Sequence, residues 1–290
     1  MLNNLEQRIP VLRDARSAAV GAPRLSSSFA RAWKGLLWAE WYAHSQVLLM
    51  FLAVWLLAVW TLPLFTHPGW ILLLGGLYAL MAGPMYGGAD VLEGCEEFTF
   101  ALPPTRIERF LSRLIVGLGT LLFLCAMNVV ALGLDLPQIL ARLYVQTGII
   151  KPLPVIKPGL LYGLIVAIPV SVFAFAFTIS AVTHSRILIL LSWFWAGVAT
   201  LALLQLGFWY EDLVWDNLNG YFACPFLLAV SASVLIYGFN SFRRKEIGKP
   251  SIPITLPGHW WIWTLLFAVG MGLALALVTS LIKHLPRFLQ

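Results

Sequence analysis

The chain has 290 residues, of which 60% are hydrophobic and only 11% are charged, and its formal net charge is +6. An ordinary soluble domain is about half apolar and about a quarter charged, so this composition excludes a soluble globular domain. The three cysteines are scattered, with no CxxC pair and no Cys/His cluster, and we therefore expect neither a disulfide framework nor a zinc site. We expect the excess basic residues in loops beside anionic lipid headgroups, with no role in binding nucleic acid.

Seven stretches of about twenty residues contain no Asp, Glu, Lys or Arg. A helix of that length crosses roughly 30 Å of hydrocarbon. No period-two alternation runs through the stretches, and open sheet edges cannot face lipid, so we predict an all-α, polytopic transmembrane bundle. The predicted spans are Val47–Phe65, Gly69–Gly88, Leu114–Leu134, Pro158–Val182, Ile187–Phe208, Phe222–Phe239 and Trp260–Ile282.

Two segments precede the first span. Residues 1–28 are predicted to form a cytoplasmic tail, and Phe29–Ser45 mixes aromatic and apolar residues with charged ones. This mixture predicts an amphipathic helix lying along the cytoplasmic membrane face. The alternative is an extension of the first span, with its tryptophans in the interfacial aromatic belt. The residues assigned to the interfacial helix are Arg31, Trp33, Lys34, Glu40 and Trp41.

Basic residues are unevenly divided between the two sides that the predicted spans define. With the N-terminus inside, 14 of the 19 Lys and Arg residues lie on the cytoplasmic side. Basic loops favour the cytoplasm, so the sequence predicts a cytoplasmic N-terminus. In the loop 135–157, on the other side, apolar residues at helical spacing between Leu136 and Tyr144 predict a short surface helix.

The segment between the second and third spans is dense in charge. It contains Asp90, Glu93, Glu96, Glu97, Glu108, Arg106, Arg109 and Arg113. A Pro103-Pro104 break precedes Thr105, which can cap a helix that starts near Arg106. One interpretation is a short amphipathic helix that presents a rigid handle to a cytoplasmic partner. The other is a solvated loop with ordinary charges.

This segment resembles the first cytoplasmic loop of ABC-2 type transporter permeases. In that family a Glu-rich segment precedes an apolar run, a Leu-Pro, a Ser/Thr-Arg and a basic residue that opens the third span. The matching residues are Glu96 or Glu97, Phe98–Leu102, Leu102-Pro103, Thr105-Arg106 and Arg113. Trp33–Tyr42 is similar to the family's N-terminal elbow helix, and Phe242–Glu246 is similar to the basic end of its last span.

The resemblance covers about residues 30–247. It implies a six-span ABC-2-like transmembrane domain over residues 29–247, with a coupling-helix loop at 89–110. Residues 248–290 add a linker and a seventh, C-terminal span, which the family core lacks. The residues implied to couple to an ATPase are Glu93, Glu96, Glu97, Arg106 and Arg109.

The chain contains no GxxxxGK[ST] motif, so it cannot bind ATP through a P-loop. The resemblance therefore implies the permease subunit of a bacterial inner-membrane exporter that binds no cofactor itself. Two copies of a separate ATPase subunit would bind ATP-Mg, and a second permease would complete a homodimer or heterodimer. Trp-rich spans without ionisable residues at depth favour an amphipathic, lipidic, peptide or drug-like substrate.

Two other functions stay open: an integral membrane enzyme acting on a lipid, and a non-transporting membrane anchor. Glu96-Glu97 invites comparison with intramembrane CAAX-type proteases, but Ala101 stands where their Arg is required. Asp212-x-x-x-Asp216 has the spacing of a Mg²⁺-diphosphate motif. Its position in an outer loop beside tryptophans favours a solvated acidic turn.

Overall fold

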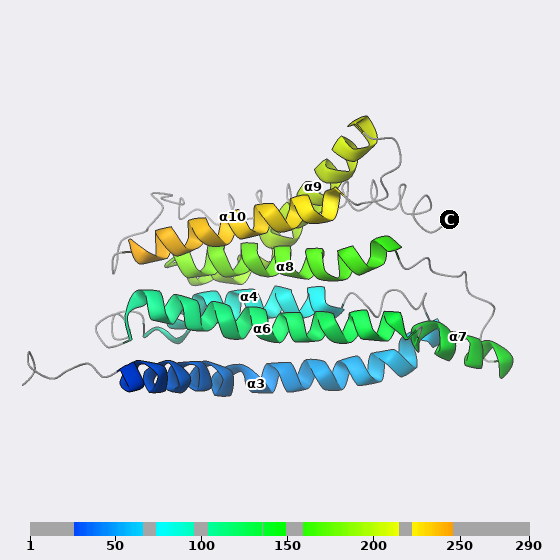
Figure 1. Ribbon diagram of the computed structural model, residues 1–290, viewed down its shortest axis with the longest axis horizontal. Coiled ribbons are helices and arrows are strands. Elements are labelled where there is room, and N and C mark those ends of the chain that lie inside the picture. The colour runs from blue at the N-terminus through cyan, green and yellow to red at the C-terminus, as the bar shows by residue number, and fades with distance from the viewer. Residues whose placement is uncertain are drawn as a thin grey trace, which may run out of the picture.

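The computed structural model describes residues 26–65, 74–95, 104–134, 136–148, 159–214 and 222–245. Every regular element in these ranges is a helix: α3 (Ser26–Phe65), α4 (Leu74–Glu93), α6 (Arg106–Gly133), α7 (Leu136–Gln146), α8 (Gly159–Val182), α9 (Arg186–Val214) and α10 (Ala223–Arg243). The helices α3, α4, α6, α8 and α10 lie along one common axis, whereas the far half of α9 leans away (Figure 1). The predicted all-α class is therefore confirmed for the described part of the chain.

Five described helices are long and apolar enough to cross a membrane: α3, α6, α8, α9 and α10. The helix α4 is not among them, although its 20 residues cover most of the second predicted span. Thirteen of those residues are buried, because α4 packs against α6, α8 and α9. The predicted span Trp260–Ile282 lies outside the described residues, so the total of seven spans stays a prediction.

The first membrane helix is longer than its predicted span. α3 runs without interruption for 40 residues. It differs from the predicted separate surface helix and matches the alternative of an extended first span. No proline lies within α3 before Pro63, so no proline ends the helix between Phe29 and the apolar core. At about 1.5 Å per residue α3 reaches about 60 Å, well beyond a bilayer core of about 30 Å.

A stripe of small residues brings α4 close to α8. Ala79, Gly83 and Gly87 follow one another at a spacing of four, which places them on one face of α4. A Cβ atom at Gly83 would lie 2.6 Å from the Ala176 side chain, and one at Gly87 would overlap the Phe177 carbonyl group. Glycine at these positions therefore permits a close contact between the two backbones, as in many membrane helix pairs.

Aromatic side chains fill the interior of the bundle around Phe110, in the second turn of α6. Its ring lies 5.1 Å from that of Phe177 on α8, edge to face, and 5.4 Å from that of Phe242 on α10. These three rings are almost completely buried. They join three helices from distant parts of the sequence.

The predicted surface helix in the loop 135–157 is present as α7. Its Leu140 is 4% exposed and packs in a cluster with Trp55 and Ala58 of α3. The apolar side of α7 thus seals the end of the bundle where α3 and α6 terminate.

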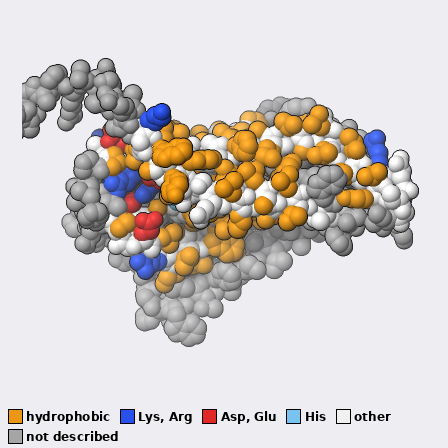
Figure 2. Space-filling model, turned by 90° about the horizontal axis from the view of Figure 1, so that it is seen from below, with side chains coloured by type: hydrophobic (Ala, Val, Ile, Leu, Met, Phe, Trp, Pro, Cys, Tyr) orange, Lys and Arg blue, Asp and Glu red, His pale blue; other side chains and the backbone are white. Residues whose placement is uncertain are grey.

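The starts of α3, α6 and α9 meet the ends of α4, α8 and α10 at one end of the bundle, which we call the basic end. Nine of the ten Lys and Arg residues in the described ranges belong to it, and the tenth is Arg142 on α7. In Figure 2 most charged side chains gather at one end, while hydrophobic side chains cover the long face between the ends.

Candidate functional site

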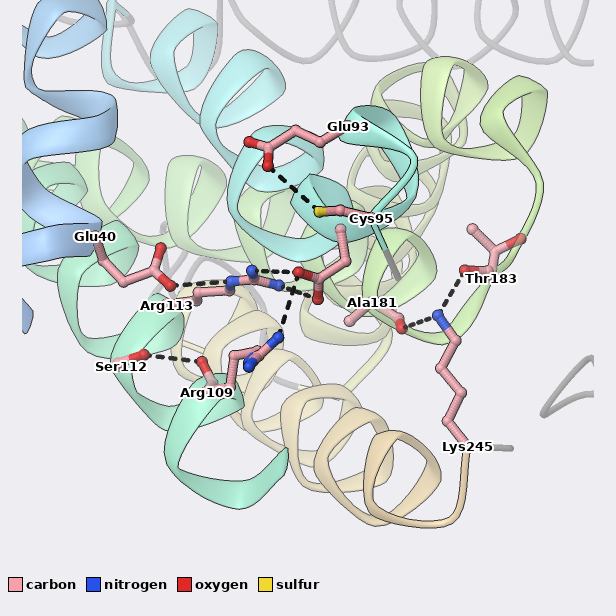
Figure 3. Close-up of polar contacts among 10 residues, drawn as sticks. Glu40, Glu93, Cys95, Arg109, Ser112, Arg113, Ala181, Thr183 and Lys245 are labelled. Atoms are coloured by element: carbon pink, nitrogen blue, oxygen red, sulfur yellow. Dashed lines mark hydrogen bonds and ion pairs between the residues drawn. The ribbon is translucent and has the colours of Figure 1, made fainter. Parts of the chain in front are cut away.

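Four charged side chains lie together near the basic end, between α3, α4 and α6 (Figure 3). Arg113 donates from Nη1 and Nη2 to the two carboxylate oxygens of Asp90, at 2.8 Å each. Its Nε donates to Oε1 of Glu40 at 3.2 Å. Nη1 of Arg109 lies 3.7 Å from Oδ1 of Asp90. We call Glu40, Asp90, Arg109 and Arg113 the ionic cluster.

The ionic cluster is buried and its formal charges cancel. Asp90, Arg109 and Arg113 are only 5%, 7% and 8% exposed. Charges removed from water are tolerated when they are paired and hydrogen-bonded, and the planar guanidinium of Arg113 meets Asp90 with two parallel bonds. Two carboxylates therefore hold two guanidinium groups inside the bundle.

Local sequence determines how α6 presents its arginines. The Thr105 hydroxyl accepts a hydrogen bond from the backbone N–H of Glu108, and the Glu108 carboxylate accepts one from the backbone N–H of Thr105 at 2.8 Å. This reciprocal capping box fixes the start of α6 at Arg106, and it confirms the cap predicted at Thr105. Arg109 and Arg113 lie four residues apart, so both project from the same side of the helix toward Asp90.

Three other basic side chains bind the carboxyl ends of helices. Lys245 Nζ donates to two carbonyl oxygens at the end of α8, at 3.2 and 2.9 Å. Arg186 Nε donates to the Val91 carbonyl of α4 at 3.2 Å, and Arg106 Nη1 donates to the Lys245 carbonyl that follows α10. The last carbonyls of a helix carry partial negative charge, which cations stabilise. These three basic residues therefore stabilise the ends of neighbouring helices.

The predicted ATPase-coupling residues occupy two different settings. Glu93 ends α4 with an exposed side chain, and its carboxylate accepts a hydrogen bond from the Cys95 thiol at 3.6 Å. Arg106 is half-buried against the end of α10, and Arg109 belongs to the ionic cluster. Glu96 and Glu97 lie outside the described residues. The two arginines thus bind other helices of the described bundle, Arg106 the end of α10 and Arg109 the carboxylate of α4.

The residues predicted for the interfacial helix also differ in their exposure and contacts. Lys34 and Trp41 are exposed, Trp33 is half-buried, and the side chain of Arg31 lies outside the described part of the structure. Glu40 turns inward to Arg113, which makes it the contribution of α3 to the ionic cluster. The sequence analysis missed this pairing. A signal for it was present, since Asp90 and Arg113 flank two consecutive, antiparallel spans at the same end.

Exposed aromatic residues indicate the depth of the ionic cluster in a membrane. Trp38, Trp41 and Tyr42 are exposed on α3 around Glu40, and such residues concentrate at the membrane interface. Counting about 20 residues of helix from Arg113 reaches Gly133, where α6 ends. The ionic cluster therefore lies about one membrane-spanning length of helix from the far end of α6.

Most carboxylates of the described site are bound by other protein groups. No group of three or more His, Cys, Asp and Glu side chains in those ranges is arranged to hold a metal ion. Asp90 is bound by arginine, and Glu108 is bound in the capping box of α6. Neither carboxylate is placed as a general acid or base.

Comparison of the chain with protein-family models, with curated proteins and with solved structures finds no match in any of the three.

Proposed function

We propose that this chain is the permease subunit of an ATP-driven exporter of the ABC-2 type. The observation that carries the proposal is that the ionic cluster joins the two helices, α4 and α6, between which residues 94–105 lie in the sequence. Asp90 lies on the helix before that segment, Arg109 and Arg113 lie on the helix after it, and α3 joins through Glu40. Separating buried ion pairs is costly, so a partner that moves the segment moves α3, α4 and α6 together.

The motor in this arrangement is a separate subunit, because the sequence has no P-loop. Glu93, Glu96 and Glu97 form the acidic surface that the ATPase grips. Arg106 and Arg109, at the start of α6, bind the end of α10 and Asp90 of α4. Two ATPase copies and two permeases, identical or different, complete the transporter.

The basic end faces the cytoplasm of a bacterial cell in this proposal. Nine of the ten Lys and Arg residues in the described ranges lie there, and positive charge favours the cytoplasmic side of a membrane. The helix α4 then counts as the second span, since it runs antiparallel to α6 within the bundle (Figure 1). The segment Trp260–Ile282 adds the seventh span.

The polar groups at depth favour an apolar or amphipathic substrate. Below the ionic cluster, α6 contains no Asp, Glu, Lys or Arg between Leu114 and Gly133, and α8 contains none at all. Their hydroxyl and amide groups bind polar groups on neighbouring helices. Asn128 Oδ1 of α6 accepts a hydrogen bond from Trp55 Nε1 of α3 at 2.7 Å, and the Ser171 hydroxyl of α8 lies 3.1 Å from that of Thr200 on α9. Ion-coupled carriers commonly use charged residues within their spans, whereas a transporter driven by an external ATPase needs none.

A tagged full-length chain, purified from its native membrane, tests the proposal. We expect a P-loop ATPase to copurify in near-equal amount and to hydrolyse ATP in the complex. The double reversal Glu96→Lys with Glu97→Lys should release the ATPase. The matched control is Glu211→Lys with Asp212→Lys, the adjacent acidic pair in the last turn of α9 at the opposite end, and this variant should retain the ATPase.

Three outcomes contradict the proposal. The first is a full-length chain that brings down no ATPase, which favours a membrane anchor for another partner. The second is a Glu96/Glu97 variant that keeps both the ATPase and its hydrolysis rate. The third is turnover of a lipid by the purified chain alone, which favours the enzyme alternative.

A further inference from the structure

An open apolar hollow lies in the side of the bundle where α3, α6 and α7 meet. Its volume is about 370 Å³. Trp55 of α3 forms one wall. Phe123, Ala126 and Met127 of α6 form the other, together with Leu134 directly after that helix, and Leu136 of α7 closes one end.

The hollow offers no hydrogen-bonding partner to an occupant. Its lining is apolar except for the indole N–H of Trp55, which already donates to Asn128 at 2.7 Å. Asn128 itself is completely buried behind the wall. An occupant that matches this surface is a hydrocarbon, since any polar group placed there would lose its hydrogen bonds to water.

The length of the hollow corresponds to one leaflet of a bilayer. Along α6 the lining extends from Phe123 to Leu134, which is about 16 Å of helix. Half of a hydrocarbon core of about 30 Å is about 15 Å. Phe123 and Leu134 are 51% and 66% exposed, so the hollow opens sideways into the lipid along this whole length.

We propose that the hollow binds one acyl chain of a membrane phospholipid, in the leaflet next to α7. The acyl chain lies between Trp55 and the small side chain of Ala126, where it fills space that protein atoms leave empty. The lipid headgroup then lies at the end of the bundle where α7 carries the exposed Arg142, a suitable partner for a phosphate. This site is independent of any transport activity.

Photolabelling of the purified full-length chain tests the site without an ATPase. The chain is reconstituted into phosphatidylcholine vesicles that contain a small fraction of phosphatidylcholine with a diazirine in its acyl chain. After irradiation, labelled residues are located by mass spectrometry. We expect severalfold more label at Phe123 and Met127 than at Leu206 in the far half of α9, which is 49% exposed, compared with 51% for Phe123.

Two matched variants separate a bound chain from bulk lipid. Ala126→Phe fills the hollow from an exposed position, so labelling of Met127 should fall to the level on α9. Ile115→Phe adds an aromatic ring on the exposed surface of the same helix, outside the hollow, and should change nothing. Equal labelling of the two faces in the unmodified chain overturns the proposal, as does an Ala126→Phe variant that is labelled like the parent. If a second copy of the chain covers the hollow, the label at Met127 is weaker than on α9.

Discussion

Removing the carboxylate charge of Asp90 should destabilise the bundle far more than removing that of Glu40. Asp90→Asn keeps the size of the side chain but leaves Arg109 and Arg113 to share one remaining carboxylate. Breaking a buried ion pair by removing one partner typically costs about 3–5 kcal/mol. Asp90 is 5% exposed and receives two 2.8 Å bonds from Arg113, so we expect a loss in that range.

The Glu40→Gln variant removes a weaker interaction. Glu40 accepts one bond from Arg113, at 3.2 Å. Its side chain is 13% exposed, compared with 7% for Asp90, so water screens it more. A single hydrogen bond to a charged group contributes about 1.5–3 kcal/mol, and we expect a loss near the lower limit.

A double-mutant cycle measures the pair itself. Arg113→Met alone should cost about as much as Asp90→Asn, because it leaves an uncompensated buried carboxylate. The combination leaves Glu40 opposite Arg109, so the charges cancel again and the double variant should recover about 2 kcal/mol or more of the summed losses. Reversible unfolding of the chain in mixed micelles, followed by tryptophan fluorescence, gives the free energies. Additive losses, or an Asp90→Asn variant no less stable than Glu40→Gln, would refute the reasoning.

Two further predictions concern the neighbouring parts of the same bundle. Gly87→Ala should lower the free energy of unfolding by about 1–3 kcal/mol, because the added methyl group overlaps the α8 backbone. Gly76→Ala should be neutral or slightly stabilising, because its Cβ would meet no atom within 4 Å. Unfolding in mixed micelles compares the two variants. Burial, the hydrogen bond to Glu93 and nearby carboxylates raise the pKa of the Cys95 thiol, so at pH 8 it should react with iodoacetamide more slowly than a free cysteine. Glu93→Gln should lower that pKa and speed the reaction, with the rate against pH shifting toward lower pH; an unchanged profile contradicts the assigned cause.

Hydropathy predicted the helices well because each span is a continuous stretch of apolar residues. The cores of α3, α6, α8, α9 and α10 fall within stretches that lack charge, and the Thr105 cap and the helix α7 follow from equally local patterns. The separate surface helix before the first span depended on a break in the backbone. Nothing between Phe29 and Ser45 supplies one, and the helix α3 continues through that segment.

The rotation of each helix about its axis could not be read from the sequence. The sequence predicts that the charges near Arg109 lie at the surface, either on a helix presented to a partner or in a solvated loop. Their inward direction depends on the rotation of α4 about its own axis. The contact of Gly83 and Gly87 with α8, about ninety residues further along the chain, fixes that rotation. Such a contact leaves no local pattern. The spacing of Arg109 and Arg113 opposite Asp90 was the available signal, and it becomes informative once α4 and α6 are treated as antiparallel neighbours.

The contacts at the basic end bear on where a transport pathway can lie. The ionic cluster joins α3, α4 and α6, Arg106 joins α6 to the end of α10, and Lys245 joins that end to α8. Arg186 completes the set by joining α9 to α4. Each of the six long helices is therefore tied to another at the end where a motor would act, and α4 is also packed tightly on α8. A bundle joined in this way moves as one body, since separating two helices that these contacts join exposes a buried charge or an unpaired carbonyl. If the proposed function is correct, ATP-driven motion must therefore change the contact between this chain and a second permease, and the substrate must pass between the two.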